Sequence, residues 1–284
     1  MHDIPKLQSL CRLLNIPDQY QRLLDDEWKS IEQSHQKYQA SDAVIWIRED
    51  SWDSSQLGKT VGKVEQLTGE NKKDILRVLS DVVQSQKFQY ILFRLNSSHL
   101  SWVQQIEESG GILLDASIEL ICTNVSAIQH HGTLTVKPYE ESYREQVKSC
   151  AGSFSHGRFF SDPLFRKGQT IYQSWIENAL DNAAADQTFI AVDHGELHGF
   201  VSIKSVKVGS KNLLHIPLIA KKLNSSRPGV GKILLSSVLE YASEHQFDGV
   251  TLGTQISNLP ALRAYTQMGF FPYASEYTCR LIAV

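Results

Sequence analysis

The stretch "SSRPGVGKILL", residues 225–235, decides how the second half of this chain folds. A candidate buried strand precedes it and an amphipathic helix follows it, so glycines stand at the first turn of a helix. The first backbone N–H groups of a helix have no intrahelical acceptor and lie at the positive end of its dipole. Gly229 and Gly231 have no Cβ, which lets an anion approach these amides closely. The stretch predicts a phosphate-binding loop; a helix start without a ligand is the alternative.

Two common nucleotide-binding motifs are excluded here. An ATPase-type loop requires a glycine where the chain has Ser226 and a hydroxyl residue where it has Ile233. A dinucleotide fingerprint requires a third glycine where the chain has Leu234. The phosphates therefore belong to another class of ligand.

A second motif follows in "NLPALRAYTQMGF", residues 258–270. It combines Asn258, Ala261, Tyr265, Gly269 and Phe270. Ala261 and Tyr265 are four residues apart, so a helix places them on one face. The alternative is an ordinary helix–strand unit with a tyrosine in its core.

Together the two motifs resemble those of the GNAT family (Gcn5-related N-acetyltransferases). That family has Arg/Gln-x-x-Gly-x-Gly/Ala after a buried strand, and the Gly-Val-Gly at 229–231 matches it. Ser226 stands at the usual Arg/Gln place, with Arg227 one residue later, and Pro228 removes one amide. The resemblance implies acetyl-CoA as the acetyl donor, held by a loop that departs from the family pattern. The cofactor contacts it implies are Leu218, Ile219, Ala220, Arg227, Gly229, Val230, Gly231, Lys232 and Asn258.

The resemblance also implies the chemistry. A tyrosine at the place of Tyr265 serves the family as general acid, protonating the thiolate that leaves. The main chain of residues 218–220 would pair with the pantetheine arm, where this strand splays from the next. Asn258 either bonds to the cofactor or caps its helix. A general base is not evident; His156 is the histidine to test, and a water relay is equally compatible.

The stretch "SFSHGRFFSDPLFRKG", residues 153–168, combines aromatic and basic side chains without clear periodicity. Aromatic faces and cations suit a base and a diphosphate, so we expect a substrate wall here, formed by His156, Arg158 and Phe159. A surface loop with a few buried phenylalanines is the alternative. Tyr172 and Trp175, on the helix that follows, are expected in the core.

Within the family, residues 153–159, 172–180 and 254–255 look like TDP-fucosamine acetyltransferases, and "WDSSQLG", residues 52–58, is similar to a signature of that group. Those enzymes acetylate a nucleotide-linked 4-amino sugar. The implied acceptor is therefore a small-molecule amine, specifically a nucleotide-linked 4-amino-deoxy sugar. A polyamine, an aminoglycoside or a peptide N-terminus remains open. So does a non-catalytic acyl-CoA-binding protein, which Ser226 and Pro228 favour and the intact second motif opposes.

The pattern of the whole chain predicts an α/β (α+β) fold, and the resemblance implies that it consists of two tandem GNAT-like αβ domains. Each has a mixed, mostly antiparallel sheet flanked by helices. We expect an N-terminal helical arm (1–41), a degenerate GNAT-like domain (42–130) and an acetyltransferase domain (131–284). Helix–glycine–strand units align when Gly110 is laid on Gly269, and Ile106 then replaces Tyr265. The first domain should therefore bind no acetyl-CoA, and should shape the acceptor site or a homodimer surface.

Composition excludes several function classes. A net charge of −3 gives no reason to expect nucleic acid or an anionic membrane as partner. No apolar run resembles a signal peptide or a membrane span. The four cysteines form no Cys-x-x-Cys pair, which argues against a disulfide framework and against a structural zinc site. We expect a cytoplasmic protein with reduced cysteines and no metal.

Overall fold

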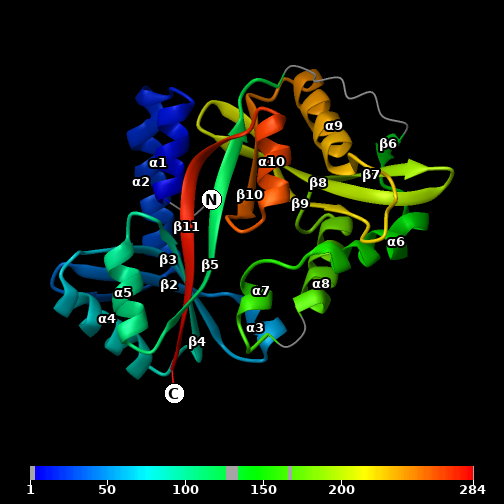
Figure 1. The fold of residues 1–284 in the computed structure, drawn as a ribbon. Coiled ribbons are helices and arrows are strands. Elements are labelled where there is room, and N and C mark those ends of the chain that lie inside the picture. The colour runs from blue at the N-terminus through cyan, green and yellow to red at the C-terminus, as the bar shows by residue number, and fades with distance from the viewer. Residues whose placement is uncertain (1–3, 126–133, 166–167, 284) are drawn as a thin grey trace. The chain divides into compact units, whose positions relative to one another are not determined.

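The computed structural model describes residues 4–125, 134–165 and 168–283, with the side chains of 4, 5 and 17–20 left aside. The expected domain boundary near residue 130 lies outside the described residues. Two compact units are present. Unit 1 comprises residues 1–117, 161–165 and 273–284, and unit 2 comprises residues 118–160 and 166–272. Both combine a sheet with helices, so the chain is α/β as predicted (Figure 1).

Unit 1 contains the N-terminal helices and the sheet order β1-β2-β3-β4-β11. The β3–β4 pair is parallel and the other pairs are antiparallel. Helices α4 and α5 share a hydrophobic core with this sheet. The elements are α1 (Ile4–Leu13), α2 (Pro17–Ser34), β1 (Gln36–Ala40), β2 (Ala43–Glu49), α3 (Ser51–Leu57), β3 (Val61–Thr68), α4 (Lys72–Gln84), β4 (Tyr90–Asn96), α5 (Leu100–Glu108) and β11 (Phe271–Ile282).

The N-terminal helical arm is shorter than predicted. We expected helix up to about residue 40, and this predicted end is wrong. Helix α2 stops at Ser34, and His35 is extended. Strand β1 follows and forms a tight hairpin with β2, in which Ala40 pairs with Ala43. The short strand alternates in burial, as a period of two requires. Helix α3 was also not predicted; Asp50 caps its start and Gly58 ends it in the left-handed region, at φ 65°.

Unit 2 has the strand order β5-β10-β9-β8-β7-β6, and the part of β5 from residue 118 onward belongs to it. Helix α9 packs on strands β7 to β10 of this sheet (Figure 1). Strands β7 and β8 form a hairpin, with His194 and Gly195 at positive φ in its turn. The elements are β5 (Ile112–Cys122), β6 (Thr135–Pro138), the 3-10 helix η1 (Glu141–Tyr143), α6 (Arg144–Ser149), the 3-10 helix η2 (Cys150–Ser153), α7 (Arg158–Ser161), α8 (Gly168–Leu180), β7 (Gln187–Asp193), β8 (Glu196–Val208), β9 (Lys211–Lys221), α9 (Val230–Glu244), β10 (Gly249–Gln255) and α10 (Leu259–Gln267).

The two glycines that align the repeat have the same backbone conformation. Gly110 after α5 and Gly269 after α10 both have φ 84°. The next residue donates its N–H to the carbonyl of Ile106 in one unit, at 2.8 Å, and of Tyr265 in the other, at 3.0 Å. Both helices thus end in the same left-handed turn.

Among the described residues, no helix is both long and apolar enough to cross a membrane.

Candidate active site

The slot of the site begins where strands β9 and β10 part. Their parallel pairing runs from Leu213 with Gly249 to Ile216 with Leu252. Pro217 follows, and on the other side of β9 the register with β8 shifts between Ser202 and Lys204. Proline has no N–H to donate and is tolerated in strands at such bulges, which are common beside active sites. Beyond Pro217, residues 218–220 still pair with β8, so their other backbone edge faces the slot.

The N-terminus of α9 provides the expected anion-binding end. Gly229 is its N-cap, in the left-handed region at φ 72°, and no side chain caps the helix. A Cβ built at Gly229 or at Gly231 would meet no atom within 4 Å. The first-turn amides, which include those of Val230 and Lys232, are therefore left for a ligand.

The cations near this loop are not all available to a ligand. Arg227 forms an ion pair with Asp193 and remains 42% exposed. Lys222 pairs with Glu196 at 2.9 Å. Lys232, in the first turn of α9, is half-buried. The backbone amides are thus the main positive partners, with Lys232 beside them.

A pocket of ≈ 470 Å³ joins the slot, the α9 N-terminus and α10. All of its lining lies in unit 2. Its wall is mostly apolar, with a few polar groups and one lysine, as small-molecule sites usually are. It is lined by Ser153, Phe154, Ser155, His156, Ile219, Ala220, Lys221, Leu223, Gly231, Leu235, Gln255, Asn258, Pro260, Ala261, Ala264 and Tyr265.

Tyr265 reaches this pocket from α10, and its side chain is only 7% exposed. Ala261, predicted to share its helix face, lines the same pocket. Burial raises the pKa of Tyr265 to about 12, because the tyrosinate would lose its hydration. The phenol therefore stays protonated at neutral pH, as a proton donor must.

Asn258 does not cap α10, although it stands at the N-cap position. Its side-chain amide instead donates to Thr254 Oγ1 at 3.2 Å, and the residue lines the pocket. Of the two roles expected for Asn258, capping is therefore wrong. A bond to the cofactor stays a prediction.

The segment 153–157 is fixed from several sides. Ser153 donates to the carbonyl of Lys221, and Phe154 stacks on Tyr172 with ring centroids 4.3 Å apart. Gly157 has φ 97°, and a Cβ there would lie 3.2 Å from Gln255 Nε2. The segment is therefore built for one conformation, which turns His156 toward the pocket.

His156 alone of the three expected substrate residues lines the pocket. Its Nδ1 lies 3.4 Å from Ser257 Oγ, and its carbonyl accepts a hydrogen bond from the Tyr172 hydroxyl at 3.3 Å. Arg158 is 9% exposed, with its guanidinium 4.1 Å from the centre of the Phe159 ring, and Phe159 is 5% exposed. The substrate role of Arg158 and Phe159 stays a prediction.

Of the remaining residues expected to contact the cofactor, some line the pocket and others do not. Ile219, Ala220 and Gly231 line the pocket, whereas Leu218 is buried beside it. Sequence reasoning missed Pro217 and Ser257, and singled out Gln255 only as part of a resemblance, with no role. A proline inside a strand is a readable signal of a bulge, but Ser257 has no signal of its own.

The chain is similar to several known proteins. Residues 155–270 match the acetyltransferase (GNAT) family. The chain is 24% identical over 241 residues to the spore coat polysaccharide biosynthesis protein SpsD of Bacillus subtilis, covering 82% of each chain. It is 23% identical over 179 residues to the dTDP-fucosamine acetyltransferase of Escherichia coli, covering 62% of this chain and 74% of the relative. A tandem GNAT protein from the clavulanic acid biosynthesis pathway has a similar fold, with a TM-score of 0.53 at 11% identity, covering 86% and 79% of the two chains.

The fold, the pocket and these matches identify a GNAT acetyltransferase domain in the second half of the chain. The protein is an acyltransferase, and its fold class is the predicted one of two GNAT-like αβ units in tandem.

Proposed function

We propose that the protein transfers the acetyl group of acetyl-CoA to the primary amine of a small molecule. One observation carries this proposal: a single pocket is lined by Gly231 at the α9 N-terminus, by the edge of β9 and by Tyr265. These three features suit the diphosphate, the pantetheine arm and the thioester of one extended donor. Holding donor and acceptor together supplies much of the rate.

The reaction forms a C–N bond and breaks a C–S bond. The neutral amine attacks the thioester carbonyl, and a backbone N–H on the β9 edge would stabilise the oxyanion that develops. The Tyr265 hydroxyl donates its proton to the leaving thiolate. The amine loses one proton, which His156 or a water accepts.

For the acceptor we propose a nucleotide-linked 4-amino-deoxy sugar. The names of both curated relatives support it, one from polysaccharide biosynthesis and one a dTDP-fucosamine acetyltransferase. A polyamine, an aminoglycoside or a peptide N-terminus would use the same chemistry. The apolar pocket wall has Lys221 as a cation and no carboxylate among its described lining residues, so it does not favour a polycationic acceptor.

The test is thiol release from acetyl-CoA across a panel of amines, run with the wild type and with Tyr265→Phe. The panel contains TDP-4-amino-4,6-dideoxy sugars, spermidine, an aminoglycoside and a short peptide. We expect rapid release with the sugar nucleotides alone, strongly reduced in the variant. Release with another amine instead would show that the acceptor belongs to that class of compound. Acetyl-CoA binding without release for any acceptor would favour the acyl-CoA-binding alternative.

A further inference from the structure

A second cationic surface lies in unit 1, on strands β2, β3 and β4. Arg48, Lys63, Glu65 and Arg94 alternate along their strands with buried neighbours that face α4 and α5, such as Ile47, so they point to the opposite face of the sheet. Arg48 pairs directly with Lys63 across the β2–β3 ladder. Like charges in that position repel each other unless something lies between them.

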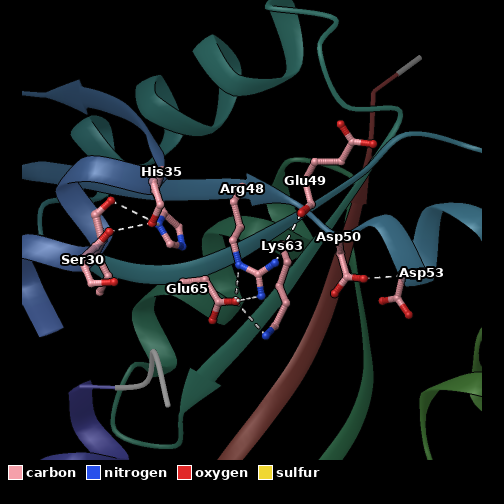
Figure 2. Close-up of polar contacts among 10 residues, drawn as sticks. Ser30, His35, Arg48, Glu49, Asp50, Asp53, Lys63 and Glu65 are labelled. Carbon is pink, nitrogen blue, oxygen red and sulfur yellow. Dashed lines mark hydrogen bonds and ion pairs between the residues drawn. The ribbon is translucent and has the colours of Figure 1, made fainter. Parts of the chain in front are cut away.

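Glu65 lies between these two cations (Figure 2). Its Oε1 accepts from Arg48 Nε at 3.0 Å and from Lys63 Nζ at 2.9 Å, and Arg48 Nη2 is 2.7 Å away. The Glu65 side chain is 7% exposed, against 37% for Arg48 and 21% for Lys63. The carboxylate is thus more buried than the two cations that it binds.

One carboxylate does not neutralise the positive charge of this surface. Arg94 is exposed, and in the part of the chain that the structure describes it makes no ion pair. The paired part of β3 and β4 ends with Val64 beside Phe93, and the next residue of each strand, Glu65 and Arg94, lines the same small hollow. Three cations therefore share one carboxylate, which leaves a net charge of about +2 on the surface.

Two further carboxylates of unit 1 are already paired and do not compensate the excess. Glu276 pairs with Lys6 at 2.7 Å, and Asp162 pairs with Arg280 at 3.0 Å. Both carboxylates are buried, with side chains 4% and 0% exposed. The positive charge stays on Arg48, Lys63 and Arg94.

Partial burial makes this excess unfavourable without a further anion. Burial lowers the pKa of Lys63, and the nearby guanidiniums of Arg94 and Arg48 lower it further, against the opposing effect of Glu65. A small hollow of ≈ 20 Å³ lies beside Arg94 and is lined also by Asn96, His99 and Glu65. It has room for about one oxygen atom.

We propose that Arg48, Lys63 and Arg94 form a binding site in unit 1 for an anion of the phosphate class, and specifically for a diphosphate. Guanidinium groups bind phosphate oxygens in bidentate pairs, and an ammonium adds a point charge. Two negative charges or more are needed to balance the excess, which a diphosphate supplies and a single carboxylate does not. Buried Glu65 holds two of the cations in place. The site is independent of acetyl transfer, since it uses no residue of the unit 2 pocket.

The experiment must separate this site from the α9 N-terminus, which also suits phosphates. Gly231→Asp places a carboxylate at that helix end, in open space, and so blocks the donor loop. In this background the full-length protein is titrated calorimetrically with inorganic pyrophosphate, orthophosphate and TDP. We expect one pyrophosphate site per chain, and weaker orthophosphate binding. TDP binding much tighter than pyrophosphate identifies a nucleotide as the source, and equal binding identifies the diphosphate alone.

Two substitutions test which residues form the site, and they should change the affinity for pyrophosphate in opposite directions. Arg94→Gln removes an exposed cation with no ion pair to lose, and should weaken pyrophosphate binding by about tenfold or more. Glu65→Gln keeps an acceptor oxygen for Arg48 and Lys63 but removes the negative charge that competes with the anion, and so should strengthen pyrophosphate binding. Arg22→Gln, which deletes an equal charge from a side chain 87% exposed on α2, is the matched control and should change nothing. Absence of pyrophosphate binding in the Gly231→Asp background, or equal effects of Arg94→Gln and Arg22→Gln, would overturn the proposal.

Discussion

Tyr265 combines burial with a position in the pocket wall, which is what a proton donor to a thiolate needs. Its phenol is 7% exposed, and its ring faces Phe270 with centroids 6.1 Å apart. Tyr265→Phe keeps this packing and removes only the hydroxyl. We expect kcat to fall by about 10²–10⁴ with little change in melting temperature. Measured kcat and KM, together with a thermal melt, check this; a variant with wild-type kcat would remove Tyr265 from the chemistry.

The same burial determines the alkaline behaviour of the enzyme. Because its pKa is raised to about 12, Tyr265 keeps its proton well above the pH at which an exposed tyrosine ionises. We therefore expect no loss of kcat from this group between about pH 8 and pH 10.5. The measurement is a pH–rate profile of the wild type beside Tyr265→Phe. A falling limb near pH 9–10 that is present only in the wild type would contradict a buried phenol.

His156 offers the other proton-transfer group of the pocket. Imidazole is the side chain best suited to accept a proton at neutral pH, and the Tyr172 hydroxyl and Ser257 hold this residue from two sides. Lys221 and Tyr265 are the other titratable groups of the pocket wall. If His156 accepts the proton of the amine, His156→Gln should lower kcat by about tenfold or more, as measured by thiol release at saturating substrates. His194→Gln, on a ring 94% exposed in the hairpin turn, is the control. An unchanged kcat in His156→Gln would favour a water relay.

At the scale of elements, two glycines near α9 have opposite roles. A Cβ at Gly199 on β8 would lie 2.7 Å from the Ala220 carbonyl and 2.8 Å from Val230 Cγ1, so this glycine lets strand and helix pack closely. Gly199→Ala should therefore destabilise the fold by about 1–3 kcal/mol. At Gly231 a Cβ would meet nothing of the protein, but would stand where an anion approaches. Gly231→Ala should raise the KM for acetyl-CoA by about tenfold, with no loss of stability.

Thermal melts and KM values on both variants separate the two roles. The expected pattern is a lower melting temperature for Gly199→Ala and a higher KM for Gly231→Ala. If Gly231→Ala bound acetyl-CoA like the wild type, the α9 N-terminus would not be the phosphate site.

Elements with a strong local period were predictable from the sequence. The helix starting at 259 was predicted correctly, because it carries an apolar stripe between a proline and a glycine. Strand β1 was not, since "QKYQA" is polar and short, and becomes a strand only by pairing with β2. Propensity alone cannot supply that partner.

The candidate site could likewise be predicted only in part. The glycines of the loop and the tyrosine of α10 could be placed from spacing alone, because a helix fixes what lies at its end and on its face. The environment of Arg158 could not, because it depends on how "GRFF" packs beneath Tyr172 of α8. That packing brings together residues of two different elements. It buries some of the basic and aromatic side chains of this segment and leaves others exposed.

At the scale of the whole molecule, the two units share a fold but differ at the helix end where we propose that phosphate binds. In unit 2, α9 begins at Gly229 with no side-chain cap. In unit 1, α4 begins at Asn71, whose Oδ1 accepts from the amides of Lys73 at 3.0 Å and Asp74 at 3.4 Å. These amides are already occupied, and the carboxylate of Asp74 in the first turn repels an anion. Ile106 also stands where the other unit has Tyr265.

One acetyl-CoA should therefore bind per chain, at unit 2. Calorimetric titration of the full-length protein with acetyl-CoA at physiological ionic strength should give a stoichiometry of about 1, and the Gly231→Asp variant should lose that binding. Opening the α4 end with Asn71→Gly should not create a second site, since Ile106 and the first-turn carboxylate remain. A stoichiometry of 2 in the wild type, or a second acetyl-CoA site that survives Gly231→Asp, would mean that unit 1 binds the donor without a free helix N-terminus. The diphosphate site of unit 1 would then have to be tested as its anchor, with Arg94→Gln as the deciding variant.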